Sequence, residues 1–457
     1  MIVTFSVANY RSFDSEETLS LVASKRLAGV HEDHAVPIPG SPTGERVLKL
    51  GILYGANGAG KSNLLKALNF FAGLAVKTRD RSSPMQREPF AFGGKSERTT
   101  DFDIQFLAQD LVYRYGLKIS DERVLEEWLV EIDGDQEKTI FERSTSDGGQ
   151  VAVELGNEAN QSDAVVALAR VGGPANQSFL ATARANLRLE DLPSQLAATI
   201  DWFSRTLMAD PRVLGDKNLA YFIDRDHQTR AGLGDYLNSW STGVTGIEIA
   251  RRLVKEDFLG LPLSADAIVE ILSIPDAAEK LSELDLEFGA QGGRGVIAHR
   301  GNDGKLYELS VRTAHAGVEN GNVGLDLEQE SDGTRRLLRL LTSLFFKVPK
   351  VFVLDEVEQS LHPKLAWEFL GAFFRQTVRS QLLVTSHESN LLDLELLRRD
   401  EIWFAEKDDR EATRLYSLLD FEVRSDSEIR KHYLQGRFGA IPFMGDIKRI
   451  VRREASA

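Results

Sequence analysis

Residues 55–62 combine glycines, a lysine and a hydroxyl in an order that can hold a phosphate group. They fit the pattern G-x-x-x-x-G-K-[ST] at every fixed position. The glycines let backbone N–H groups curl around phosphate oxygens, and the N-terminus of a following helix adds the positive end of its dipole. In this pattern the lysine reaches the β- and γ-phosphates of a nucleotide, and the hydroxyl ligates Mg²⁺. The residues expected to contact the nucleotide here are Gly55, Asn57, Gly58, Gly60, Lys61, Ser62 and Asn63.

The segments on both sides of this loop are those that the pattern needs. Residues 47–54 are mostly apolar and predict a buried strand, and residues 63–71 carry apolar side chains at helical spacing. A strand, a glycine-rich loop and a helix in this order favour a phosphate site over a chance glycine-rich turn.

A second group of reactive side chains lies far downstream. Residues 351–354 form an apolar run that is typical of a parallel strand buried on both faces, and Asp355 and Glu356 follow it directly. Ligands of open α/β sheets bind where such strands end. We therefore expect Asp355 to hold the Mg²⁺ shell together with Ser62, and Glu356 to act as the general base toward the attacking water.

Residues 381–385 form another apolar strand, and His387 follows it. This histidine could hydrogen-bond the γ-phosphate or the water and so sense hydrolysis. The alternative is a histidine whose nitrogens are satisfied at a strand end. Its position after a second buried strand favours the functional interpretation, and makes His387 a catalytic candidate beside Lys61 and Glu356.

Ser331 and Gly333 lie just before the apolar helix expected over residues 337–346. A helix N-terminus with a serine hydroxyl and a glycine can accept a phosphate from a second molecule. The alternative is simple helix capping by Ser331 and Asp332. A further pair, His31 and His34, has no third ligand nearby in sequence, and we expect both side chains to be solvated.

Strand and helix patterns divide the chain. Residues 100–107 and 111–119 predict paired strands around a turn, and residues 124–132 and 138–143 extend the meander. Helical patterns dominate from about residue 160 to 281, with the spans 163–171, 178–187, 192–208 and 265–281.

The fold class expected from these patterns is α/β, with one nucleotide-binding domain split by a mainly helical insertion. The predicted parts are residues 1–145 for its first half, 146–290 for the insertion, 291–420 for its second half and 421–457 for a tail.

Composition narrows the class of protein. The chain has 457 residues, no cysteine and a formal net charge of −14. Without cysteine there is no disulfide or thiolate site, which suits a cytoplasmic protein. No stretch approaches the roughly 18 apolar residues of a membrane span, and residues 1–7 lack the features of a signal peptide. The acidic charge disfavours coating by nucleic acid but leaves room for a local basic groove.

Taken together, these motifs resemble an ABC-type ATPase head of the branch that includes RecF, SMC-like and OLD-family proteins. The resemblance is carried by residues 5–13 as the first strand and turn, 331–334 as the signature motif and 358–363 as the D-loop. It implies a mixed sheet with flanking helices and an antiparallel β-lobe. It also implies nucleotide contacts from Asn9 and Arg11, and a homodimer or higher even oligomer that sandwiches ATP and Mg²⁺. Gln86 and Gln105 are both candidates for the Q-loop glutamine.

Residues 433–443 resemble more narrowly the standalone bacterial ATPases of the RloA-like and PARIS AriA-like kind, found in anti-phage and abortive-infection operons. That resemblance implies a sensor or switch that controls a nuclease- or toxin-like protein effector from the same operon. A RecF-like ATPase that clamps DNA is the alternative, and a transporter subunit is a third reading. No membrane partner is expected.

Overall fold

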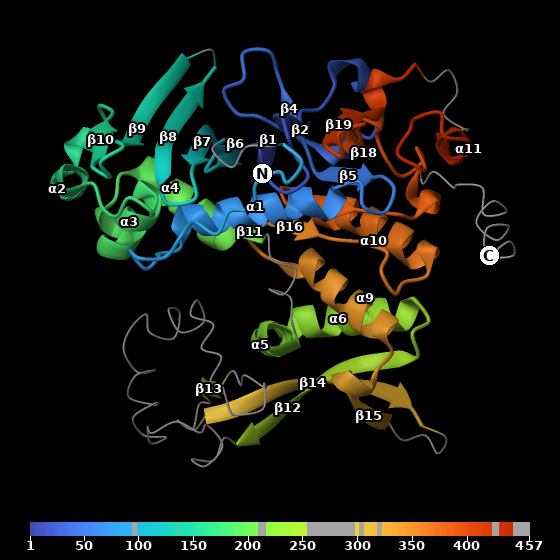
Figure 1. Cartoon of the computed structure of the whole chain (residues 1–457). Helices are drawn as coiled ribbons and strands as arrows, with labels where there is room; N and C mark the ends of the chain where they lie inside the picture. The colour runs from blue at the N-terminus through green and yellow to red at the C-terminus, as the bar shows by residue number, and fades with distance from the viewer. Residues whose placement is uncertain are drawn as a thin grey trace, which may run out of the picture. The chain divides into compact units, whose positions relative to one another are not determined.

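The computed structural model describes residues 1–93, 98–134, 136–208, 216–253, 298–300, 306–317, 322–422 and 429–441 (Figure 1). The chain forms two compact units. The first, the head unit, comprises Met1–Asp210, Val348–Glu358 and Ala366–Ala457, and the second, the insert unit, comprises Pro211–Lys347 and Gln359–Leu365.

A six-stranded sheet forms the centre of the head unit. Its order is β11-β16-β17-β5-β18-β19, and all neighbours are parallel except the edge pair β18 and β19. Because parallel strands end at the same edge, the residues that follow β5, β16 and β17 meet there. The strands are β5 (Leu50–Tyr54), β11 (Leu207–Met208), β16 (Val351–Leu354), β17 (Gln381–Thr385), β18 (Ile402–Lys407) and β19 (Thr413–Ser417).

The strand predicted over residues 47–54 is two strands. β4 (Arg46–Leu48) pairs with β3 (Ala35–Pro37) in a separate two-stranded sheet, and β5 joins the central sheet. The break falls at Lys49, whose buried ammonium donates to the Thr377 carbonyl at 2.7 Å. A long polar side chain that must reach this carbonyl interrupts an otherwise apolar run.

A seven-stranded antiparallel sheet forms the β-lobe of the head unit, in the order β10-β9-β8-β7-β6-β1-β2. The predicted meander is confirmed in its strands and its turn. Phe71 of α1 (Lys61–Val76) stacks on Phe102 and Tyr115 of this lobe at 5.3 and 5.5 Å. One continuous core joins α1 to both sheets. The strands are β1 (Ile2–Ala8), β2 (Glu17–Ser20), β6 (Thr100–Ala108), β7 (Leu111–Ile119), β8 (Val124–Asp133), β9 (Gln136–Thr145) and β10 (Val151–Leu155).

Three helices in the head unit lie where helices were predicted: α2 (Asp163–Val171), α3 (Phe179–Asn186) and α4 (Ser194–Asp201), with α2 beside β10 (Figure 1). The helix predicted over residues 192–208 was too long, since α4 ends at Asp201 and residues 207–208 form β11. The buried Glu127 of β8 caps α3 by accepting the N–H groups of Phe179 and Leu180 at 2.5 and 3.1 Å. Such bonds bind this helical stretch to the β-lobe, so the unit boundary falls near residue 210 and not at the predicted residue 145.

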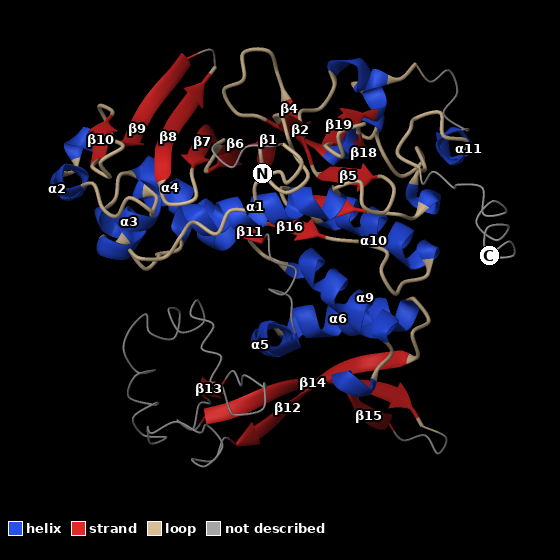
Figure 2. Ribbon diagram, viewed as in Figure 1, coloured by secondary structure: helices blue, strands red, loops and turns tan. Residues whose placement is uncertain are grey.

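The described part of the insert unit combines a small sheet with the helices α5, α6 and α9, which Figure 2 shows on one side of β12 and β14. The helix expected over residues 265–281 lies outside the described residues. The signature helix α9 belongs to this unit and not to the head. The elements are α5 (Asp216–Arg225), α6 (His227–Ser239), β12 (Val244–Leu253), β13 (Ala298–Arg300), β14 (Leu306–Ala316), β15 (Asn322–Asp326) and α9 (Asp332–Thr342).

His34 is buried, which contradicts the expectation that it is solvated. Its Nδ1 lies 3.0 Å from Glu401 Oε1, and its ring stacks on Phe374 of α10 (Pro363–Gln376) with the centroids 3.5 Å apart. Burial lowers the pKa of His34 to about 4, so the imidazole is neutral at pH 7. His31 stacks on it, with the centroids 4.7 Å apart.

The described part of the predicted tail folds back onto the head unit. Tyr433 of α11 (Ile429–Leu434) stacks on Phe404 of β18 at 5.8 Å, and it meets Tyr54 edge-on at 5.9 Å. Residues 423–428 and 442–457 lie outside the described residues. With its mixed sheet, flanking helices and antiparallel lobe, the structure confirms the predicted α/β fold class. Among the described helices, none is long and apolar enough to cross a membrane.

Candidate nucleotide site

The loop between β5 and α1 is held against the start of β19 and the turn after β1. Gly60 has a φ of +105°, and a Cβ there would lie 2.0 Å from Thr413 Oγ1 and 2.7 Å from Ser12 Oγ. Only glycine fits both this conformation and this contact. Thr413 Oγ1 donates to the Ala59 carbonyl at 2.8 Å, which fixes the loop. Asn57 and Gly58 form its exposed tip.

Lys61 is the first residue of α1 and is only 5% exposed. Its Nζ donates to the carbonyls of Gly55 and Ala56 at 2.8 and 3.0 Å, so the ammonium folds back onto its own loop. Burial lowers the pKa of Lys61 to about 8, and the charges of Asp355, Glu356 and Glu358 offset part of that shift.

Ser62 and Asp355 meet as the magnesium prediction requires. Ser62 Oγ donates to Asp355 Oδ1 at 3.1 Å, and Thr385 Oγ1 donates to the same oxygen at 2.5 Å. A hydroxyl and a carboxylate are hard oxygen donors of the kind that Mg²⁺ takes alongside phosphates and waters. In the described part of the chain, no three His, Asp or Glu side chains form a metal site by themselves. The Ser62 hydroxyl and the Asp355 carboxylate fit an ion shared with a nucleotide.

Glu356 is held in the left-handed region, with a φ of +50°. Its backbone N–H donates to Thr385 Oγ1 at 2.8 Å, and its carboxylate lies 3.7 Å from His387 Nε2. Its side chain is 43% exposed, so a water can reach it. A positive φ is uncommon for a residue other than glycine, and such backbone strain clusters at functional sites.

His387 stands between the two other catalytic candidates. Its Nδ1 lies 3.5 Å from Lys61 Nζ, and its Nε2 faces Glu356. Five predicted residues thus converge at one edge of the sheet: Lys61, Ser62, Asp355, Glu356 and His387.

The predicted contacts from the turn after β1 have partners of their own. The Asn9 amide donates to the carbonyls of Arg98 and Thr99 at 3.0 and 2.8 Å, and its oxygen accepts the Phe90 N–H at 3.2 Å. The Arg11 guanidinium pairs with Glu88. The Asn9 side chain therefore stabilises this turn. Its amide can contact a nucleotide only if these hydrogen bonds break.

Asn63 donates to Ser12 Oγ at 2.9 Å and so also ties the loop to this turn. Of the two Q-loop candidates, Gln105 sits within β6 opposite Arg114, while Gln86 is exposed, with a φ of +54°. Their role remains a prediction.

Ser331 and Gly333 lie in the insert unit. Ser331 Oγ accepts the Thr334 N–H at 3.1 Å and so caps α9. A Cβ on Gly333 would lie 2.7 Å from the Ser360 carbonyl, so glycine permits this close approach. Capping, the alternative set out above, is present, and phosphate binding in trans stays a prediction.

Sequence reasoning missed Thr385, Glu358, Ser12 and Thr413 as parts of the site. Thr385 carried a signal, because a hydroxyl ends a buried strand that neighbours the Asp-Glu strand. Ser12 and Thr413 are 401 residues apart, and their hydrogen bond of 2.8 Å leaves no local pattern.

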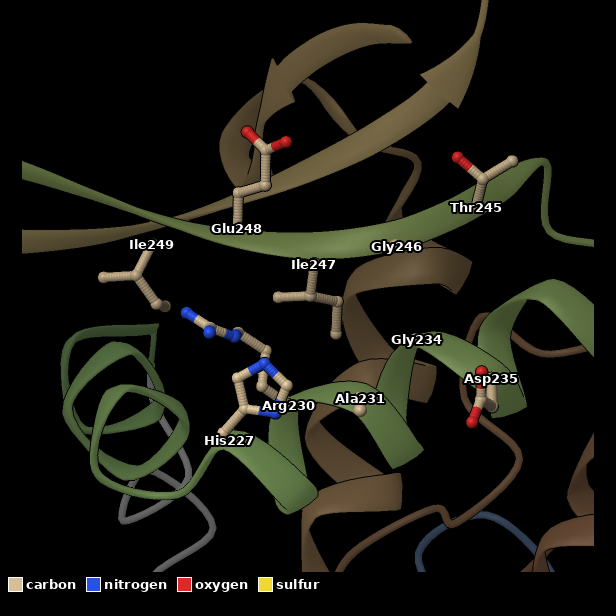
Figure 3. A pocket seen from close by; sticks show the side chains of 10 residues that line it. All are labelled: His227, Arg230, Ala231, Gly234, Asp235, Thr245, Gly246, Ile247, Glu248 and Ile249. Carbon is tan, nitrogen blue, oxygen red and sulfur yellow. The ribbon is translucent and has the colours of Figure 1, made fainter.

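A hollow of about 590 Å³ lies elsewhere, in the insert unit between α6 and β12 (Figure 3). Figure 3 shows His227 and Arg230 on the helix near Ile249, with Glu248 pointing to the other side of the strand. None of the predicted site residues lines this hollow.

The family model described as "AAA domain, putative AbiEii toxin, Type IV TA system" matches residues 51–166 and 234–393. These spans cover more than half of the chain and include both halves of the site. The chain belongs to this family. The coarse prediction of a P-loop ATPase domain is thereby confirmed, and such domains bind ATP with Mg²⁺. A comparison with curated proteins finds no match.

Solved SMC heads are similar at low identity. An SMC head bound to the C-terminal winged-helix domain of ScpA is 13% identical over 94% of this chain and 99% of its own, with a TM-score of 0.39. The SMC head of Thermotoga maritima is 12% identical over 92% and 99%, with a TM-score of 0.38. A Pyrococcus furiosus SMC head with an extended coiled coil, bound to the C-terminal domain of ScpA, is 13% identical over 96% and 99%, with a TM-score of 0.35. At these values the likeness carries no inference about activity or partners.

Proposed function

We propose that this protein is an ATP-hydrolysing switch of a bacterial anti-phage system. The observation that carries the proposal is the convergence of Lys61, the Ser62–Asp355 pair, Glu356 and His387 at one edge of the parallel sheet. A phosphate loop alone serves for binding, whereas this set also contains a base and a polar group beside it.

Each residue has a distinct task in the proposal. The Lys61 ammonium turns from the loop carbonyls to the β- and γ-phosphates of ATP. Ser62 and Asp355 would hold Mg²⁺, which when bound would neutralise charge on the phosphates. Glu356 orients the attacking water and accepts its proton, and the His387 imidazole hydrogen-bonds the γ-phosphate or that water.

The switch consists of ATP-dependent pairing of two copies, in which Ser331 and Gly333 of one chain close on the nucleotide of the other. The α9 N-terminus supplies N–H groups and a serine hydroxyl for such a contact. Control of a nuclease- or toxin-like effector from the same operon follows the resemblance of residues 433–443 to RloA-like and AriA-like ATPases. The matched family model, with its toxin–antitoxin description, supports that context. A chain without cysteine suits the cytoplasm.

The variant Glu356→Gln tests the catalytic part. We expect it to bind MgATP, to hydrolyse it roughly 10²–10³-fold more slowly because the base is lost, and to accumulate as an ATP-bound dimer. Phosphate release measures the first effect, and light scattering during gel filtration with ATP or ADP measures the second.

A matched control is Glu411→Gln, which removes an exposed carboxylate that pairs with Lys407 at 2.8 Å. It should behave as wild type. Hydrolysis by Glu356→Gln at the normal rate would show that the base is another residue, and a monomer in every nucleotide state would rule out the switch.

The neighbouring reading frame tests the defence context. A nuclease- or toxin-like product that co-purifies with the wild-type chain, and whose activity changes when ATP is added, supports the proposal. The alternative of a DNA clamp predicts salt-dependent DNA binding instead, and a net charge of −14 does not favour it.

A further inference from the structure

Glu358 lies two residues after the candidate base, on the segment that leaves β16. Its Oε1 accepts the backbone N–H of His387 at 2.6 Å. Two more bonds knit the same segments together, because the N–H groups of Glu356 and Val357 donate to the Thr385 hydroxyl and carbonyl at 2.8 and 3.1 Å. The ends of β16 and β17 are therefore bonded to each other next to the reacting groups.

The other oxygen of Glu358 is unusual. Oε2 is buried, and among the described residues it has no hydrogen-bond partner. The hydroxyl of Tyr54, the last residue before the phosphate loop, is also buried without a hydrogen bond of good geometry, although the Ser386 side chain lies near it. Burial raises the pKa of Tyr54 well above its usual value, and the nearby charge of Glu358 adds to that shift. A carboxylate with one buried oxygen that lacks a hydrogen bond costs stability, so its presence needs a reason.

The position of His387 supplies that reason. Its two ring nitrogens lie 3.5 Å from Lys61 Nζ and 3.7 Å from Glu356 Oε1, at the outer limit of useful contact. At such separations a small rotation of the backbone at residue 387 decides whether the imidazole meets either group. The only side chain among the described residues that is seen to accept the His387 N–H is Glu358.

We infer that Glu358 is a positioning residue, whose carboxylate holds the His387 backbone so that the imidazole stays between Glu356 and Lys61. The inference rests on the proposed function, because it assigns a task within ATP hydrolysis. It does not make Glu358 a ligand of the nucleotide, since its contact is with a backbone N–H group.

Three variants distinguish the effect of losing the hydrogen bond from the effect of losing the charge and from a loss of folding stability. Glu358→Ala removes both, and we expect kcat to fall roughly 10–100-fold while KM for MgATP stays within about twofold. Glu358→Gln keeps an oxygen that can accept the N–H, and should recover kcat to within about threefold of wild type. Glu358→Asp withdraws the acceptor by one methylene and should lower kcat like Glu358→Ala, with little disturbance of packing.

Glu388→Ala is the matched control. Glu388 follows His387 in sequence, but its carboxylate accepts the N–H of Asn390 at 2.8 Å, so kcat should not change. Binding of a fluorescent ATP analogue and thermal unfolding are recorded for every variant. At a pH well below the Lys61 pKa of about 8, a structural role would change nucleotide affinity and unfolding temperature together with kcat, whereas a positioning role would change kcat alone.

The inference is overturned if Glu358→Ala and Glu358→Asp keep the wild-type kcat, if affinity falls in parallel with kcat, or if Glu358→Gln is as slow as Glu358→Ala. The wild type and Glu356→Gln are measured in the same assay. A wild type that binds but does not hydrolyse ATP refutes the proposed function and this inference with it. An active wild type with unaffected Glu358 variants refutes the inference alone.

Discussion

The two edges of the parallel sheet in the head unit both bury polar side chains, but they differ in how well those side chains are satisfied. At the starting edge, where β5, β17 and β18 begin, the buried side chains of Arg398 and Gln381 have hydrogen-bond partners, whereas the indole N–H of Trp403 has none among the described residues. At the opposite, ending edge, where β5, β16 and β17 end, Glu356 has a positive φ and Glu358 keeps one buried oxygen without a hydrogen bond among the described residues.

At the starting edge, Arg398 and Gln381 use their buried polar groups in hydrogen bonds to nearby side chains and backbone groups. Arg398 donates Nε and Nη2 to the two oxygens of Asp400 at 2.9 and 2.7 Å, and its backbone N–H reaches Glu401 at 2.7 Å. Gln381 donates to the carbonyls of Ile2 and Leu48 and accepts the Ile2 N–H at 2.6 Å. In the described chain, neither of these two side chains leaves a buried polar atom without a partner.

The ending edge differs in this respect. Glu356 has a positive φ, Lys61 has a pKa lowered to about 8 by burial, and Glu358 keeps one buried oxygen without a partner among the described residues. The two edges of this sheet therefore use their buried polar groups in different ways. Saturated networks hold the fold together, and incompletely satisfied groups remain available for a ligand.

The variant Lys61→Ala should have the largest effect on nucleotide binding and hydrolysis. The effect should be limited to the site at the ending edge and should not disturb the fold. Without the ammonium, the β- and γ-phosphates lose their main protein cation, so ATP hydrolysis should fall by about 10³-fold or more and nucleotide binding should be lost. The measurement is nucleotide binding by fluorescence together with phosphate release. Circular dichroism should show a folded protein, and retained ATP affinity would contradict the site.

The variant Arg398→Met, at the starting edge, should lower stability and leave ATP binding unchanged. It leaves Asp400 buried without its guanidinium, and we expect the free energy of unfolding to fall by about 3 kcal/mol. The value stays at the low end of such effects because Asp400 Oδ2 also accepts the Ser24 N–H at 2.7 Å. Denaturant unfolding measures it, and KM for ATP should not change.

The double variant Arg398→Met with Asp400→Leu sharpens this test. Replacing both partners by apolar groups removes the unpaired charge, so it should be more stable than Arg398→Met alone. If the double variant were less stable, or if either variant weakened ATP binding, the two edges would not be independent.

The two edges also differ in how far the sequence predicts them. The ending edge follows from local patterns, because the phosphate loop and the Asp-Glu strand end are each contiguous. The helix and strands that position them are predicted within a few residues. The exception is the strand at residues 47–54, where Lys49 diverts the chain into a second sheet.

The starting edge was not predictable, since its contacts join distant parts of the chain. His34 looked like a loop histidine, and its burial depends on Glu401 and Phe374, more than 300 residues away. At the ending edge, the contact of Glu358 was not predictable either, because its hydrogen bond is to a backbone N–H group. A hydrogen bond between a side chain and a backbone group needs no particular second residue, so it produces no pattern of residue types in the sequence.

The pH dependence of ATP binding gives the smallest effect. Below the Lys61 pKa of about 8 the ammonium is charged and affinity should be constant. Above it the free protein loses the proton that phosphate binding requires, so affinity should fall by about tenfold between pH 7.5 and 9, and binding at pH 8.5 should take up a proton. Calorimetry in two buffers of different ionisation enthalpy measures both.

Glu358→Gln sharpens this last test. Burial is the main cause that lowers the Lys61 pKa, and the negative charges of Asp355, Glu356 and Glu358 act against it. Removing one of those charges should lower the Lys61 pKa further. The break in affinity, which is the pH above which ATP affinity falls, should then move to lower pH. The starting edge offers the control, because Arg398→Met leaves those charges in place and should leave the break where it is. An affinity independent of pH across this range would mean that the bound phosphates do not depend on a titrating Lys61.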